Sequence, residues 1–175
     1  TLDLAYQSGL LSTPFHRVYM NDGSLLRETL PGTRFKIPIG LRANYFIGGK
    51  FIIRSFYRYY QDDWGMTSHT AHIELPYKIS PFFSVSPFYR YYHQTKIDYF
   101  APYQENKPGA EYFSSDYDLS GFDSQFFGVG VRYIPIKIIA NLFAISQMEL
   151  RGALYNRSDG LSAGILTFHI QFKGF

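Results

Sequence analysis

The sequence contains no cysteine, which excludes a disulfide framework and thiolate chemistry. It also lacks a run of about 18 apolar residues, the length that a transmembrane helix requires. Charged residues make up only 18% of the chain, below the usual share of about a quarter, which argues against a surface that is solvated on every side. The net charge of +3 is too small to indicate nucleic-acid binding. No signal peptide or initiating methionine precedes Thr1, so we expect an internal or processed start.

Aromatic residues, in contrast, are abundant, at 19% with 16 Tyr and 17 Phe. The segment Phe-Tyr-Arg-Tyr-Tyr occurs twice, at Phe56–Tyr60 and at Phe88–Tyr92. Because successive side chains of a strand point to opposite faces, the two tyrosines that flank the arginine share one face and the arginine lies on the other. Tyr is enriched in strands and at membrane–water interfaces. An outward tyrosine girdle with inward arginines is typical of a barrel in a lipid bilayer.

Alternation of apolar and polar residues predicts eight strands, at 1–8, 33–47, 51–61, 69–79, 82–94, 124–133, 143–156 and 161–173. A further hairpin is expected around Asn21-Asp22-Gly23, between Phe15–Met20 and Leu25–Leu30. Pro38, Pro76 and Pro87 lie inside predicted strands, where they are expected to mark bulges or irregular pairing.

The connections between these strands sort into two sets. One end has the turns at 48–50, 80–81 and 134–142, and the other has the connections at 9–32, 62–68, 95–122 and 158–160. Mostly short turns at one end and mostly long loops at the other are typical of transmembrane barrels.

The predicted fold is all-β, an antiparallel up-and-down transmembrane β-barrel of about eight strands, either whole or half of a larger barrel. Residues 1–175 form its one domain, with long extracellular loops at 9–32 and 95–122, and a soluble β-sandwich is the alternative. The terminal Phe175 resembles the assembly signal of outer-membrane barrels, shifted by one residue.

Several short segments resemble, in order and over nearly the whole chain, a family of Gram-negative outer-membrane β-barrel proteins catalogued as a domain of unknown function. They are Gln7-Ser8-Gly9, Thr13-Pro14-Phe15, Arg58-Tyr59-Tyr60, Asp62-Asp63-Trp64-Gly65, Ser68-His69-Thr70, Arg90-Tyr91-Tyr92, Asp98-Tyr99-Phe100 and Ser115-Asp116-Tyr117 to Phe122-Asp123. The resemblance implies that this chain matches the C-terminal half of the family's members. It implies the outer membrane of a Gram-negative bacterium and supplies no activity, substrate or catalytic residue.

The predicted inward face is basic. Its candidates for a lumen or anion-binding site are Arg58, His72, Arg90, Glu74, Arg54 and Arg151, and the first three are expected to lie close together on adjacent strands. One interpretation is a lumen that binds or passes anions. The other is a filled interior in which the arginines pair with carboxylates and stack on aromatic rings.

The long loop at 95–122 carries the candidates for extracellular partner binding, Tyr99, Phe100, Tyr103, Tyr112 and Tyr117. Tyrosine is a common anchor of interfaces. The alternative is a loop that folds back and packs on itself.

Two patterns suggest chemistry at the rim, but neither is complete. Asp62 and Asp63 with His69 and His72 could form a carboxylate–histidine pair that activates water. Asp116, Asp118 and Asp123 could bind calcium, although they lack the spacing of a calcium loop. The sequence therefore predicts no catalytic residue, no metal, no cofactor and no enzyme activity.

The predicted function is that of an integral outer-membrane β-barrel with a structural or partner-binding role in a cell-envelope assembly. Its expected partners are outer-membrane lipid and other envelope proteins, and nucleic acid is not expected. The alternative is a pore or transporter that passes small anionic solutes through an arginine-rich lumen.

Overall fold

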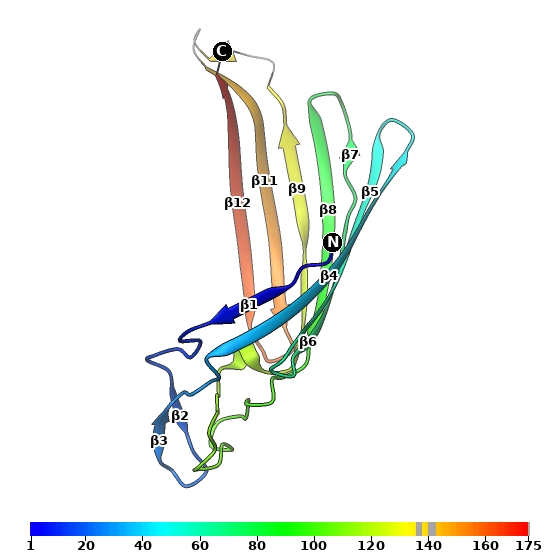
Figure 1. Ribbon diagram of the computed structural model, residues 1–175. Helices are drawn as coiled ribbons and strands as arrows, with labels where there is room; N and C mark the ends of the chain where they lie inside the picture. Colours follow the sequence, from blue (N-terminus) through cyan, green and yellow to red (C-terminus); the bar gives the residue numbers. More distant parts are fainter. Residues whose placement is uncertain (136–137, 140–142, 175) are drawn as a thin grey trace. The chain divides into compact units, whose positions relative to one another are not determined.

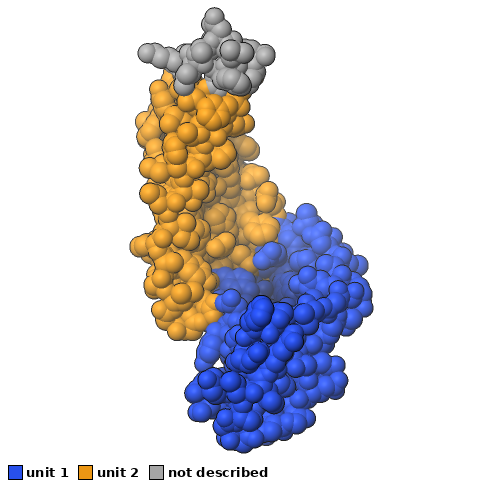
Figure 2. Space-filling model, turned by 90° about the vertical axis from the view of Figure 1, so that its left-hand side faces the viewer, with its two compact units in different colours: residues 1–41, 58–69, 92–123 blue, residues 42–57, 70–91, 124–175 orange. Residues whose placement is uncertain are grey.

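The computed structural model describes residues 1–135, 138–139 and 143–174. In this part of the chain the secondary structure is strands and one short 3-10 turn, Tyr117–Leu119. None of its helical segments is long and apolar enough to span a membrane. The chain divides into two compact units (Figure 2). Unit 1 comprises residues 1–41, 58–69 and 92–123, and unit 2 comprises residues 42–57, 70–91 and 124–175.

One antiparallel sheet contains all the long strands, each beside the long strand that precedes it in the chain (Figure 1). Its order is β1 (Ala5–Ser8), β4 (Thr33–Ile47), β5 (Phe51–Asp62), β6 (Thr67–Glu74), β8 (Phe83–Gln94), β9 (Phe122–Tyr133) and β11 (Phe143–Arg157), and β12 (Ser162–Gly174) also pairs with β11. The short β7 (Tyr77–Lys78) pairs with β5 and β8, and β10 (Ile138–Ile139) pairs with β11. A separate hairpin joins β2 (Arg17–Tyr19) and β3 (Leu25–Arg27).

These elements confirm an all-β, antiparallel arrangement. Every predicted strand has a counterpart in the sheet, and the hairpin around Asn21-Asp22-Gly23 forms, with Gly23 at φ +83° as a tight turn requires. The polar loop expected at Asp62–Ser68 is shorter than predicted, because β5 extends to Asp62 and β6 begins at Thr67. The turn expected at Ile134–Leu142 lies largely outside the described residues, as does Phe175.

Pro38 does not produce the bulge expected of it. It lies inside β4, and pairing along this strand keeps one register from Leu2↔Ile39 to Ser8↔Thr33. The Pro38 carbonyl accepts a hydrogen bond from the Asp3 N–H at 3.1 Å, but proline has no N–H to donate in return. The loss of that bond explains why β1 begins at Ala5 and not at Thr1.

Pro76 and Pro87 also leave the register unchanged. Pro76 separates β6 from β7, so the strand expected at His69–Ile79 is broken in two. The Pro87 carbonyl accepts a hydrogen bond from the Leu75 N–H at 2.9 Å, which continues the Tyr77↔Val85 pairing. Proline therefore causes no bulge at these sites and removes single hydrogen bonds, and the break at Pro76 is the irregular pairing that was expected as the alternative. A register shift does occur between Ile145 and Gln147, at a site without proline.

Unit 1 contains an apolar core built largely from loop residues. Leu30, Trp64, Met66, Ile97 and Phe100 form one buried cluster, and Val18, Met20 and Phe113 form a second. The loops at 9–32 and 95–122 contact one another through the bridges Met20↔Asn106 and Thr29↔Phe113. These loops therefore fold into an ordered body with its own interior.

Unit 2 has the opposite distribution of apolar side chains. Among its described residues only Phe88 is a buried hydrophobic, at 7% exposure. Its exposed large hydrophobics include Tyr45, Phe46, Tyr57, Ile73, Tyr89, Phe127, Val129, Leu150, Leu154, Leu166, Phe168 and Phe172. On β11, Leu150 is 46% exposed, whereas the adjacent Glu149 side chain is only 13% exposed. Apolar residues thus occupy the more exposed face of this strand and charged residues the more protected one.

Candidate functional site

One face of unit 2 carries a group of charged residues that we call the arginine face. It consists of Arg42, Arg54, Arg90, Arg132 and Arg151 with the carboxylates of Glu74 and Glu149. Alternation along β4, β5, β6, β8, β9 and β11 places these residues on one side of their strands. The residues therefore converge from six strands of the sheet.

Arg151 lies at the centre of this face. Its guanidinium donates to Glu74 Oε1 at 2.7 Å, and its Nε donates to Glu149. Glu149 also accepts from Arg132 at 3.2 Å, and Arg54 approaches Glu74 at 3.6 Å. The ion pairs thus form a continuous chain from Arg54 to Arg132.

Aromatic rings provide the second support for these cations. The guanidinium carbon of Arg151 lies 5.4 Å from the Phe88 ring centroid. Arg90 lies 4.8 Å from the Phe126 centroid, and Arg42 lies 5.6 Å from that of Phe56. Such contacts are attractive because the ring face carries negative electrostatic potential. Arg42 and Arg90 make no ion pair among the described residues, so these rings are their supports in the structure.

The charge on this face is not balanced. Five guanidinium groups share two carboxylates, and Glu74 divides its charge between Arg151 and Arg54. Arg42 and Arg90 are exposed and have no counter-charge among the described residues, so they raise the local positive potential. The arrangement is therefore suited to hold an anion from outside the protein.

A cavity of about 400 Å³ opens at one part of this face. Arg42, Arg54, His72, Asn44, Phe56 and Glu74 contribute to its lining. The size lies within the usual range of about 300–1,000 Å³ for small-molecule sites.

Five of the six predicted lumen residues belong to unit 2. Arg54, Glu74 and Arg151 are joined by ion pairs as described, His72 lines the cavity, and Arg90 stacks on Phe126. The His72 ring also lies 6.3 Å from that of Phe88. Arg58 belongs to unit 1, where its side chain is exposed. The expected proximity of Arg58 to His72 and Arg90 stays a prediction.

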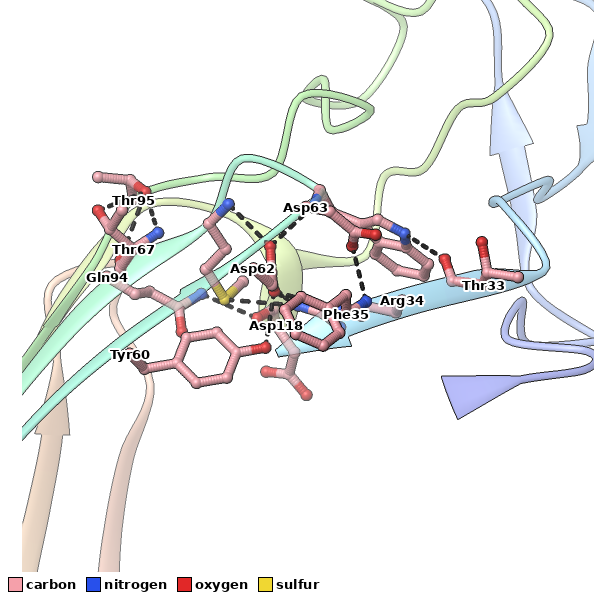
Figure 3. A network of polar contacts seen from close by, with 12 residues as sticks. Thr33, Arg34, Phe35, Tyr60, Asp62, Asp63, Thr67, Gln94, Thr95 and Asp118 are labelled. Atoms are coloured by element: carbon pink, nitrogen blue, oxygen red, sulfur yellow. Dashed lines mark hydrogen bonds and ion pairs between the residues drawn. The ribbon is translucent and has the colours of Figure 1, made fainter. Parts of the chain in front are cut away.

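In unit 1, the carboxylate of Asp62 organises the turn between β5 and β6 (Figure 3). Oδ2 accepts from Arg34 Nε at 2.9 Å and from the Tyr60 hydroxyl at 2.7 Å. Oδ1 accepts from the backbone N–H groups of Trp64 at 3.0 Å and Met66 at 3.1 Å. The Asp62 side chain is fully buried. All its acceptor capacity is therefore used in holding the turn.

Trp64 completes this network. Its indole N–H donates to the Thr33 carbonyl at 2.9 Å, and the Arg34 guanidinium lies 4.4 Å above its ring. Neighbouring Asp63 accepts from the Phe35 N–H at 3.0 Å. Since Asp62 is engaged by these donors, the carboxylate–histidine pair suggested at the rim does not form through it.

The predicted partner-binding aromatics differ in their exposure. Phe100 is 7% exposed and packs in the core of unit 1, so it offers no surface to a partner. Tyr99 packs edge-on against Trp64 and contacts Tyr112, and its burial raises the pKa of the Tyr99 phenol. Tyr103 and Tyr117 are 56% and 48% exposed. The loop thus packs on itself and leaves two of the five aromatics at the surface.

Several pairings in unit 1 were not predicted. His93 Nδ1 lies 2.9 Å from Asp123 Oδ1, and the buried Glu28 accepts from the Ser114 hydroxyl at 2.6 Å and from the Thr13 N–H at 2.7 Å. Their members are far apart in the sequence, so no spacing signal could find them. Asp116 accepts from the Asp118 N–H as a turn cap, and within the described part of the chain no group of three or more carboxylate or histidine side chains is placed to hold a metal ion.

Arg34 and Arg42 lie on the predicted basic face but were not among its candidate residues, and the pairing of Arg34 with Asp62 was not predicted. Arg42 carried a signal, because the alternation of 33–47 puts it on the basic face. Counting back along both strands from the Gly48–Lys50 turn brings Asp62 opposite Lys36 and next to Arg34. Hairpin register was therefore the signal that could have identified this pair.

Comparison with known proteins gives a family but no function. A family model described as a protein of unknown function, DUF3570, matches residues 1–166. No curated protein matches the chain, and no solved structure matches it.

Proposed function

Since the chain belongs to the DUF3570 family of proteins of unknown function, we propose its function from its own geometry. The protein is an integral outer-membrane β-barrel of a Gram-negative cell, with a structural or partner-binding role in an envelope assembly. The observation that carries this proposal is the inverted distribution of side chains in unit 2. Its large apolar residues are exposed, whereas the carboxylates of Glu74 and Glu149, which pair with arginines, lie on the opposite and more protected face.

This distribution is unfavourable in water and favourable in lipid. Exposed apolar patches of more than a few hundred Å² are rare on soluble monomers. A bilayer solvates an apolar outer face, while alternate residues of each strand point to a polar interior. The strands are also long enough, because a transmembrane strand needs about 9–11 residues. β8 and β9 have 12 residues each, and β12 has 13.

Closure of the sheet is part of this proposal. Among the described strands β12 pairs only with β11, which leaves one edge of β12 without a strand partner. Unpaired backbone groups are costly in the hydrocarbon core, so a spanning sheet has to close. The barrel is therefore completed by a further strand at β12. That strand comes either from the other end of the same sheet or from a larger barrel of which these strands are half.

The partner-binding role is supported by unit 1. Its loops form an ordered body with a buried core, and Tyr103 and Tyr117 remain exposed on it. Exposed tyrosines on a rigid support are favourable interface anchors, because little side-chain entropy is lost on binding. The expected partners are outer-membrane lipid and other envelope proteins.

Extraction and gel mobility test the barrel. We expect the purified protein to require detergent and to migrate differently in dodecyl sulfate gels before and after boiling, because a closed barrel resists unfolding until it is heated. Extraction into plain buffer together with identical mobilities would instead support the soluble β-sandwich.

A second function, the passage of small anions, is favoured by the uncompensated cations Arg42 and Arg90. A lumen with excess positive charge lowers the barrier for anions. Planar-bilayer recordings in asymmetric potassium chloride should then give a reversal potential that shows chloride selectivity. Absence of channels from heat-shifting protein would eliminate this second function and leave the structural role standing.

A further inference from the structure

The cavity of unit 2 combines uncompensated charge with neutral polar groups. Arg42 makes no ion pair among the described residues, and its guanidinium is oriented by the Phe56 ring at 5.6 Å. Among the described residues Arg54 has only Glu74 as an ion-pair partner, at 3.6 Å, beyond the usual reach of a hydrogen bond. Two guanidinium groups that line this cavity therefore retain free donors.

Glu74 does not neutralise the site. Its Oε1 is engaged by Arg151 at 2.7 Å, a closer contact than the one it makes to Arg54. Glu74 is also 8% exposed and fixed between these two arginines. The cavity thus keeps a net positive charge, and its one carboxylate is committed to the protein.

The neutral lining indicates what the anion is attached to. Asn44 offers an amide with donors and an acceptor, and Phe56 supplies a ring face. A cavity of about 400 Å³ exceeds the needs of an inorganic ion. Hydroxyl groups on a compact body would suit these polar partners.

We propose that this cavity binds a small hydroxylated molecule that carries a phosphate or carboxylate, such as a sugar phosphate. The oxyanion lies between Arg42 and Arg54, whose planar guanidinium groups match its oxygens in bidentate geometry. The hydroxylated body contacts Asn44. The molecule is either a free solute or the headgroup of a lipid, since both present the same chemistry.

This site goes beyond the structural role proposed above and does not require ion conduction. A barrel can bind such a ligand without passing it, and a conducting barrel can lack a fixed site. Binding and conduction are therefore separate measurements on the same protein.

Calorimetric titration of the purified full-length protein in detergent tests the proposal. Glucose 6-phosphate should bind saturably, and glucose, which has the same ring without the phosphate, should not. Mixed micelles with a phosphorylated-sugar lipid form a second arm. Binding in either arm identifies the source of the oxyanion, and binding in neither overturns the site. Equal binding of glucose would overturn the assignment of an anion.

Two charge-matched variants test the location. Arg42→Gln should weaken glucose 6-phosphate binding by about tenfold or more, because a charge-assisted hydrogen bond is lost. Arg27→Gln removes the same charge from an exposed residue of unit 1 that does not line the cavity. It should change the affinity less than about twofold at a salt concentration that screens distant charges. Equal losses of affinity in both variants would mean diffuse electrostatic attraction and would overturn the site.

Each variant is compared only after its heat-dependent mobility matches that of the parent protein. Arg42→Lys keeps the charge but lacks the planar, two-pronged guanidinium group, so it should bind with intermediate affinity.

Discussion

Asp62→Ala should destabilise unit 1 by about 3–5 kcal/mol, the range observed when one member of a buried ion pair is removed. The substitution leaves the Arg34 guanidinium, whose side chain is 13% exposed, without its carboxylate. It also leaves the N–H groups of Trp64 and Met66 without their acceptor at the β5–β6 turn. Each of these groups is buried, so water cannot readily replace the lost oxygen atoms.

The measurement uses Trp64, the only tryptophan in the sequence, which lies inside the affected turn. Its fluorescence during denaturant unfolding reports the opening of this part of unit 1. Asp63→Ala is the matched control, because it removes a carboxylate from the adjacent, exposed residue, which accepts one backbone hydrogen bond at 3.0 Å. The control should cost at most about 1 kcal/mol. Similar midpoints for the two variants would contradict the role of Asp62.

Asp62 also marks how far sequence reasoning reaches in this protein. Strand positions follow from the period of two, and β4 was predicted at its observed limits, Thr33–Ile47. Local signals were sufficient there because one face of each strand is uniformly apolar. The ends of the strands were less certain, because the polar segment at Asp62–Ser68 reads as a loop while its first aspartate is a buried acceptor in β5.

The site was predictable only in part, for reasons of register and distance. The basic face follows from alternation, so the sequence alone identifies Arg54, Glu74 and Arg151, which the structure joins by ion pairs. Which cation remains unpaired depends on side-chain geometry across several strands, and Arg42 was therefore not singled out. Contacts between the loops, such as that of Glu28 with Ser114, depend on how two irregular segments pack and carry no periodic signal.

The side-chain inversion of unit 2 has a direct energetic consequence. Leu154 lies on β11, in register with Phe127 on β9 and Gly164 on β12, and is 52% exposed. If this face meets water, Leu154→Arg should change stability by no more than about 0.5 kcal/mol, as for other surface substitutions. If it meets lipid, the same substitution should cost about 1–3 kcal/mol, because Leu154 lies between the middle of β11 and its end at Arg157, and the cost rises to about 2–4 kcal/mol only at the middle of the bilayer. We expect the second result.

Leu161→Arg provides the matched control for this prediction. Leu161 is also 52% exposed, but it lies in the turn before β12, where its carbonyl accepts from the Arg157 N–H at 2.8 Å. An arginine at a turn reaches the polar interface, so its cost should fall to about 0–1 kcal/mol. Unfolding by urea in phospholipid vesicles, together with the fraction of heat-shifting protein, measures both variants. Leu154→Phe, which keeps an apolar side chain, should assemble normally. If Leu154→Arg were as stable as Leu161→Arg, both positions would face the same solvent. The outer face of unit 2 would then be a water-facing surface.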